Sequence, residues 1–144
     1  MIDITSIQAR LSGLDGWLFF DHHGRDPIAY RILGLKPGAL TRRWFYWIPA
    51  GGTPAKLVHR IEKSVLDALP GVRIEYSTWE ELQSGLRRIL ASAKSIAMQY
   101  SPRCELPAIS MVDAGTVELI RSLGAEVNSS AALVQYFEAR WTPD

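Results

Sequence analysis

The alternation of strand-type and helix-type segments in the second half of the chain constrains the fold most. Residues 72–77 place Val72, Ile74 and Tyr76 at every second position, as in a strand with one buried face. Thr78 and Glu81 then form a capping-box pattern, which predicts that a helix begins there. A second strand and a second helix follow, so we expect an α/β fold with a mixed, largely parallel sheet covered by helices.

The first half of the chain adds one antiparallel hairpin. Residues 42–49 contain five consecutive strand-forming residues, and residues 55–60 form the returning strand after a turn with two glycines. Residues 16–20 are apolar without alternation, which indicates a strand buried on both faces. With further strands over residues 95–100 and 125–129, the sheet should have five to six strands.

The predicted helices have recognisable ends. Asp26 and Pro27 begin one that ends at Gly34, and Asp113 begins another that ends at Gly124. Apolar residues at helical spacing indicate the core-facing sides of four further helices. They are Ile4, Ile7 and Leu11 in an opening helix; Ile61, Val65, Leu66 and Leu69 in a short helix; Trp79, Leu82, Leu86, Ile89, Leu90 and Ala93 in the helix that begins at the capping box; and Leu133, Val134, Phe137 and Trp141 in a final helix capped by Ser130. Residues 1–144 are expected to form a single domain.

Composition excludes several classes of function. The formal net charge of +1 gives no electrostatic footprint for nucleic acid or for an anionic membrane. The single cysteine, Cys104, cannot form an internal disulfide, which fits a reducing compartment. The first residues lack the pattern of a signal peptide, and no segment reaches the roughly 18 apolar residues of a membrane span. We therefore expect a cytoplasmic protein.

The densest group of polar residues follows the first buried strand. Asp21, His22, His23, Arg25 and Asp26 fall within six positions. Such a group is either a site or the cap of the next helix. The two histidines are adjacent and would point to opposite sides of an extended chain, so a shared metal ion is disfavoured and the cap is favoured.

Catalytic alternatives find little support in the residues. A nuclease of the ribonuclease H type needs several carboxylates around divalent ions, but apart from Asp21 the strands end in Pro49, Arg60, Ser77 and Tyr100. A small metal-dependent hydrolase using Asp21, His22, His23 and Asp26 stays open as a third interpretation.

Other motifs have simpler explanations. Arg42 and Arg43 precede an aromatic run that could stack single-stranded nucleic acid, but the neutral overall charge favours a buried strand with a solvated start. The sequence contains no Gly-x-Ser-x-Gly elbow and no glycine-rich phosphate loop. Cys104 lies between two prolines with no neighbouring base, which is typical of an unreactive thiol. The residues alone therefore support no reaction.

Several segments, in their order and spacing, resemble the creatinase/prolidase-type N-terminal domain of Xaa-Pro aminopeptidases and prolidases. The similarity covers nearly the whole chain. The segments are residues 16–26, 28–30 and 33–34, the hairpin 45–49 with 57–59, and residues 76–82, 98–102, 112–117 and 129–141.

The resemblance implies a mixed sheet with helices on both faces, a ribonuclease H-like motif, and a following pita-bread catalytic domain. In that family two Asp, one His and two Glu bind two metal ions in the second domain, which this chain lacks. The N-terminal domain helps to form dimers and borders the entrance to the active site. No cofactor is expected in this domain, and divalent metal ions are expected only in the missing catalytic domain.

The resemblance thus predicts a non-catalytic N-terminal domain of an Xaa-Pro aminopeptidase/prolidase-like metallopeptidase, cut at a domain boundary. Its expected partners are the missing catalytic domain and a second copy in a homodimer, with no nucleic acid and no membrane. The residues expected at the substrate entrance or at an interface are Asp21, His22, His23, Arg25 and Asp26. The alternative is a free-standing binding or assembly module without a catalytic half.

Overall fold

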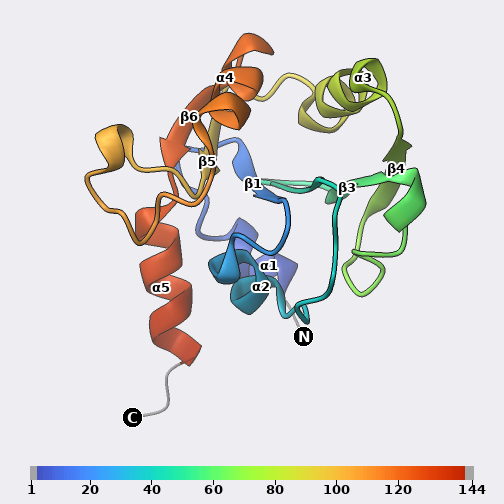
Figure 1. Cartoon of the computed structure of the whole chain (residues 1–144). Coiled ribbons are helices and arrows are strands. Elements are labelled where there is room, and N and C mark those ends of the chain that lie inside the picture. The colour runs from blue at the N-terminus through green and yellow to red at the C-terminus, as the bar shows by residue number, and fades with distance from the viewer. Residues whose placement is uncertain (1–2, 142–144) are drawn as a thin grey trace.

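A computed structural model describes residues 3–141 and shows a mixed sheet between two layers of helices (Figure 1). Within these residues, six strands are arranged in the order β4-β3-β2-β1-β5-β6. The strands are β1 (Gly16–Asp21), β2 (Trp44–Pro49), β3 (Ala55–His59), β4 (Val72–Tyr76), β5 (Ser95–Met98) and β6 (Glu126–Ser129). Strand β2 is antiparallel to both of its neighbours, and the other pairs are parallel. The predicted α/β fold is confirmed.

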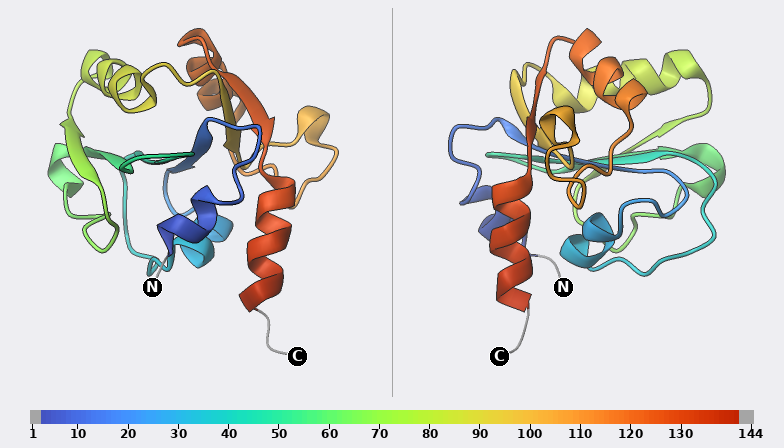
Figure 2. Two further views of the ribbon diagram at one scale, coloured as in Figure 1. Left: turned by 180° about the vertical axis from the view of Figure 1, so that it is seen from behind. Right: turned by 60° about the vertical axis from the view of Figure 1, so that its left-hand side comes forward.

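Helices cover both faces of the sheet, as Figure 2 shows from two sides. One face carries α3 (Trp79–Leu90) and α4 (Ala114–Ser122), and the other carries α1 (Ile4–Gln8), α2 (Pro27–Leu33) and α5 (Ala131–Trp141). Two short 3₁₀ helices, η1 (Arg60–Glu62) and η2 (Pro102–Cys104), lie in the connections. In the part of the chain that the structure describes, no helix combines the length and apolarity that crossing a membrane requires.

Strand β1 separates two hydrophobic cores. Trp17 and Phe19 belong to the core beneath α1, α2 and α5, whereas Leu18 and Phe20 belong to the core beneath α3 and α4. Residues 16–20 are buried, as their apolar run predicted, and the strand also buries Asp21, which the run did not include. Because β1 pairs with β2 along its full length and with β5 at its start, the turn after Asp21 is anchored at the centre of the sheet.

The predicted helix ends are confirmed by their hydrogen bonds. The Asp26 side chain accepts from the backbone N–H of Ala29, and Gly34 ends α2 in the left-handed conformation with φ of 69°. Thr78 and Glu81 form the reciprocal capping box of α3. These local signals therefore place the helices that follow β1 and β4.

The predicted helix over residues 61–69 is wrong. The chain forms η1 followed by turns closed by bonds such as Val65 N to Glu62 O and Leu69 N to Leu66 O. Leu66 and Leu69 are buried, but Ile61 is 73% exposed. A 3₁₀ helix has three residues per turn and an α-helix has 3.6. Apolar residues at α-helical spacing therefore do not share one face here, and Ile61 does not face the core.

Trp79 is also misplaced by the helical pattern, because its side chain is 50% exposed. It is the first residue of α3, which begins beyond the end of β4, so the apolar stripe runs past the sheet there. The Arg43 guanidinium lies 5.4 Å from the centre of the Trp79 ring. The core-facing residues of α3 are Leu82, Leu86, Ile89 and Leu90.

The final helix begins after Ser130 as predicted, but the Ser130 hydroxyl donates to Gln99 Oε1 at 2.9 Å. Leu133, Val134 and Phe137 are buried as expected. The expected packing of the Trp141 side chain lies outside the described residues.

Candidate functional site

The polar cluster after β1 divides into an inward and an outward part. The carboxylates of Asp21 and Asp26 are buried, with 1% and 2% of each residue exposed. His23 and Arg25 are exposed, and His22 is intermediate. Residues that are neighbours in the sequence therefore lie in two different environments. The two carboxylates lie in the interior, and the other three side chains are fully or partly exposed.

Asp21 holds the turn together from inside. Its carboxylate accepts hydrogen bonds from the backbone N–H groups of Gly24 and Asp26, at 2.8 and 2.9 Å, and from the Tyr30 hydroxyl at 2.9 Å. Burial, together with the Asp21 carboxylate, raises the pKa of Tyr30 to about 12, so its hydroxyl stays protonated and donating. His23 and Gly24 adopt left-handed conformations, which reverse the chain within this turn.

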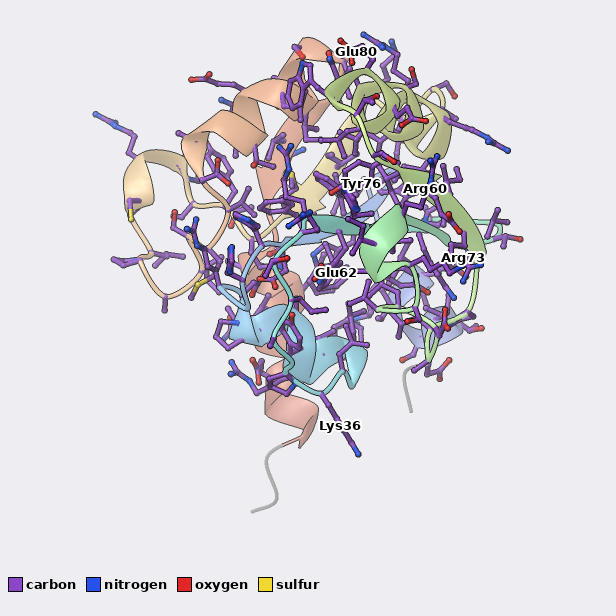
Figure 3. All side chains as sticks on the ribbon, turned by 45° about the vertical axis from the view of Figure 1, so that its right-hand side comes forward. Lys36, Arg60, Glu62, Arg73, Tyr76 and Glu80 are labelled. Carbon is purple, nitrogen blue, oxygen red and sulfur yellow. The ribbon has the colours of Figure 1, made fainter. Side chains whose placement is uncertain are left out.

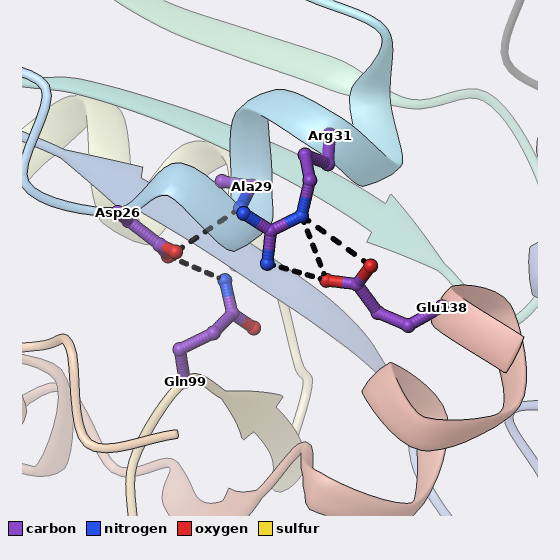
Figure 4. A network of polar contacts seen from close by, with 5 residues as sticks. All are labelled: Asp26, Ala29, Arg31, Gln99 and Glu138. Carbon is purple, nitrogen blue, oxygen red and sulfur yellow. Dashed lines mark hydrogen bonds and ion pairs between the residues drawn. The ribbon is translucent and has the colours of Figure 1, made fainter. Parts of the chain in front are cut away.

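Asp26 belongs to a buried hydrogen-bond network centred on Gln99, which we call the Gln99 network. Gln99 Nε2 donates to Asp26 Oδ2 at 2.7 Å, while Gln99 Oε1 accepts from Trp17 Nε1 at 2.8 Å and from the Ser130 hydroxyl at 2.9 Å. Figure 4 shows the Asp26 carboxylate between Gln99 and Ala29. Burial raises the pKa of Asp26, and the hydrogen bonds from Gln99 and Ala29 oppose that rise.

The role of Gln99 was not predicted from the sequence. Its position directly after the apolar residues of β5 could have indicated this role, because a polar side chain at the end of a buried strand needs hydrogen-bond partners. The same view in Figure 4 shows Arg31 on α2 paired with Glu138 on α5, with an Nη2 to Oε1 distance of 2.7 Å. Together, these contacts join the turn after β1 to the last helix.

Two of the outward residues, His22 and Arg25, line a pocket of about 490 Å³. We call it the basic pocket, and its charged and imidazole lining consists of His22, Arg25, Arg42, Arg43, His59 and Asp113. It lies where β1, β3 and β4 end, β2 begins and α4 starts. Open α/β sheets bind ligands in this kind of position, outside the carboxyl ends of the strands.

Positive charge surrounds His22 in the basic pocket. Partial burial lowers the pKa of His22, and the charges of His23, Arg25 and Arg43 lower it further. Asp113 caps α4 by accepting from the backbone N–H and the hydroxyl of Thr116. Burial alone would raise the pKa of Asp113, but these hydrogen bonds and the Arg25 charge outweigh it, so the pKa is lowered.

The two adjacent histidines do not point to opposite sides, contrary to the expectation for an extended chain. His23 has a φ of 64°, and the His22 and His23 rings meet edge to face with centroids 4.3 Å apart. Among residues 3–141, no group of three or more His, Cys, Asp and Glu side chains is placed to hold a metal ion.

The fold described above is that of creatinase/prolidase N-terminal domains. The N-terminal domain of an X-Pro dipeptidase from Streptococcus pyogenes is similar, with a TM-score of 0.68 and 16% identity, covering 92% of this chain and 96% of that one. A proline dipeptidase structure from Streptococcus pneumoniae gives a TM-score of 0.71 and 14% identity, covering 96% of this chain and 98% of that one.

A longer structure, the dipeptidase from Pyrococcus horikoshii, gives a TM-score of 0.67 and 18% identity. The similarity covers 98% of this chain but 36% of that one. No protein-family model matches the sequence, and no curated protein matches it significantly. At these identities the similarity establishes the fold.

Proposed function

We propose that this chain is the non-catalytic N-terminal domain of an Xaa-Pro dipeptidase or prolidase-like metallopeptidase. The observation that carries the proposal is the similarity over almost the whole chain to structures that are described as N-terminal domains of X-Pro dipeptidases. The matched part is only about a third of the longer prolidase and dipeptidase chains, at 33% and 36%. A further domain would hold the divalent metal ions and the peptidase chemistry.

In this proposal the turn after β1 borders the substrate entrance or an interface of a homodimer. Asp21 and Asp26 hold this turn from inside, because each of their carboxylate oxygens accepts at least one hydrogen bond within the domain. The side chains that this turn leaves fully or partly exposed are those of His22, His23 and Arg25. The positive charge of Arg25 and the imidazole N–H groups of the two histidines would suit a carboxylate or a polar edge on the partner domain.

The first test is an assay of the 144-residue chain for hydrolysis of Xaa-Pro dipeptides and tripeptides with added Mn²⁺, Co²⁺ or Zn²⁺. We expect no turnover, because a metal site of this class needs several convergent ligands. Turnover that persists through purification and disappears in His23→Ala would contradict the proposal and support the metal-dependent hydrolase.

The second test uses a longer chain whose coding sequence continues beyond Asp144 into a catalytic domain of the kind proposed here. His22→Ala, His23→Ala and Arg25→Ala are introduced singly, with Arg88→Ala on the exposed face of α3 as the matched control. At least one of the three should change KM for an Xaa-Pro dipeptide or the dimer dissociation constant, while the control changes neither. If all three behave like the control, the turn lies at neither the entrance nor an interface.

The alternative function is a free-standing binding or assembly module. The observation that favours it is that the basic pocket is built from residues of this one chain. Reading the coding sequence beyond Asp144 separates the two proposals, because a downstream segment with two Asp, one His and two Glu in the family's pattern supports the peptidase.

A further inference from the structure

The residues that line the basic pocket carry an excess of positive charge. Among the arginines and carboxylates of this lining, Arg25, Arg42 and Arg43 contribute three positive charges and Asp113 contributes one negative charge, which leaves two positive charges. The Glu62 carboxylate, which interacts with the charge of Arg42, is not part of the lining. Among the described residues, no ion pair joins any of these three guanidinium groups to a carboxylate. A dianion would balance this excess.

The backbone that carries two of the arginines is held in place. The Glu62 carboxylate accepts from Thr41 N at 3.0 Å and from Arg42 N at 2.9 Å. The Tyr76 hydroxyl donates to the Arg43 carbonyl oxygen at 2.6 Å. Glu62 is the last residue of η1, and Figure 3 shows Tyr76 near this element, whereas Lys36 from the preceding loop points away from the domain. Such anchoring reduces the entropy that a ligand must overcome to order the loop.

Neutral donors supplement the arginines. His59 Nδ1 accepts from the backbone N–H of Ile61 at 3.0 Å, so the proton of the neutral ring resides on Nε2. Asp113 is already engaged by the backbone N–H and the hydroxyl of Thr116, at 2.9 and 2.7 Å. The Arg25 charge also acts on this carboxylate, but among the described residues no ion pair joins the two groups, so the guanidinium keeps its N–H donors for a ligand.

We propose that the basic pocket binds the phosphate group of a small phosphorylated molecule through Arg25, Arg42 and Arg43. A phosphate monoester carries a charge of about −1.5 to −2 at neutral pH and presents three acceptor oxygens to guanidinium forks. The pocket volume of about 490 Å³ falls within the range of small-molecule sites and leaves room for the group that bears the phosphate. The proposal does not depend on a second domain.

The test is a titration of the whole 144-residue chain with inorganic phosphate, followed by amide NMR at constant ionic strength set with chloride. We expect saturable shifts confined to residues around the pocket. Binding should weaken about tenfold or more in Arg42→Gln and in Arg43→Gln, since each removes charge-assisted hydrogen bonds. Arg88→Gln, which removes an exposed charge on α3, is the matched control and should bind like the native chain.

Two further measurements, the His22 titration and a comparison with acetate, test whether the bound ion is phosphate in this pocket. In the phosphate-bound state the His22 pKa should rise from its lowered value, because the bound anion offsets the charges of Arg25 and Arg43.

Acetate should bind far more weakly than phosphate. Equal binding of acetate and phosphate would overturn the phosphate assignment and indicate a carboxylate site. Shifts that do not saturate, that centre elsewhere, or that Arg88→Gln weakens as much as Arg42→Gln would overturn the site itself. Thermal unfolding of each arginine variant checks that the substitution, at an exposed or partly exposed position, leaves the fold intact.

Discussion

Gln99 Nε2 donates to Asp26 Oδ2 across 2.7 Å and so joins two loops that are 73 positions apart in the chain. The orientation of the Gln99 amide follows from its other partners, because Trp17 and Ser130 both donate to Oε1. The amide nitrogen must then face an acceptor, which Asp26 provides. This single side chain connects β1, the start of α2, the end of β5 and the start of α5.

Gln99→Leu should destabilise the domain by about 3 kcal/mol, because it leaves the buried groups of Asp26, Trp17 and Ser130 without their shared partner. Urea unfolding measures the loss as a lower midpoint. Gln135→Leu, at an exposed position of α5, is the control and should stay within about 0.5 kcal/mol of the native chain. A native midpoint in Gln99→Leu would show that the network adds nothing to stability.

Asp26 and Asp113 should titrate on opposite sides of the ordinary aspartate pKa of 3.8. Burial raises the Asp26 pKa, so between 3.8 and that raised value the native state holds a proton that the unfolded state has released. The contribution of Asp26 to stability therefore falls as pH rises through this window. Asp113 has the opposite sign: its contribution is present above 3.8 and is lost as pH falls through its lowered pKa.

Carboxyl-detected NMR of the native chain measures both titrations in one sample. A midpoint for Asp26 below that of Asp113 would contradict the environments described for the two carboxylates.

Leu86 and Trp79 were expected to share one core-facing stripe, and the structure separates them. Leu86 is fully buried against the sheet, so Leu86→Ala should cost about 2–5 kcal/mol. Trp79 is half exposed, so Trp79→Ala should cost about 1 kcal/mol, mainly through its contact with Arg43. Comparing the two urea midpoints checks the order, and a larger loss for Trp79→Ala would mean that the helix begins deeper in the core.

Much of the fold was predictable because its signals are local. Asp26, Thr78 and Asp113 cap helices through bonds to residues three positions away, and such bonds can be read from sequence spacing. The exposure of Trp79 depends on where the sheet ends, and the turns after η1 depend on packing that no short window contains. The fold was therefore predicted more closely than the surroundings of its individual side chains.

The candidate site was predicted only in part for the same reason. Arg25 and His22 lie in the predicted cluster, but His59 and Asp113 reach the basic pocket from 34 or more positions away in the chain. The burial of Asp21 likewise depends on the left-handed turn at His23, which no propensity for histidine indicates. Tertiary contacts decide which polar residues frame the turn and which of them line the pocket.

The pairing of β1 with β2 leaves no room for a side chain at residue 16. A Cβ on Gly16 would lie 2.6 Å from the carbonyl oxygen of Ile48 and would also contact the Trp47 ring. The carbonyl cannot retreat without disturbing the ladder in which Gly16 faces Pro49. Gly16→Ala should therefore destabilise the domain by about 1–3 kcal/mol, as overpacking of a well-filled core does.

Gly38→Ala is the matched control for this prediction, because nothing lies within 4 Å of its Cβ position and its φ is not in the left-handed region. It should leave stability unchanged or raise it by about 0.4–1 kcal/mol through the unfolded state. Thermal and urea unfolding of both variants measure the difference. If Gly16→Ala proves as stable as Gly38→Ala, then β2 can shift away from β1, and the central pairing of the sheet is looser than the structure describes.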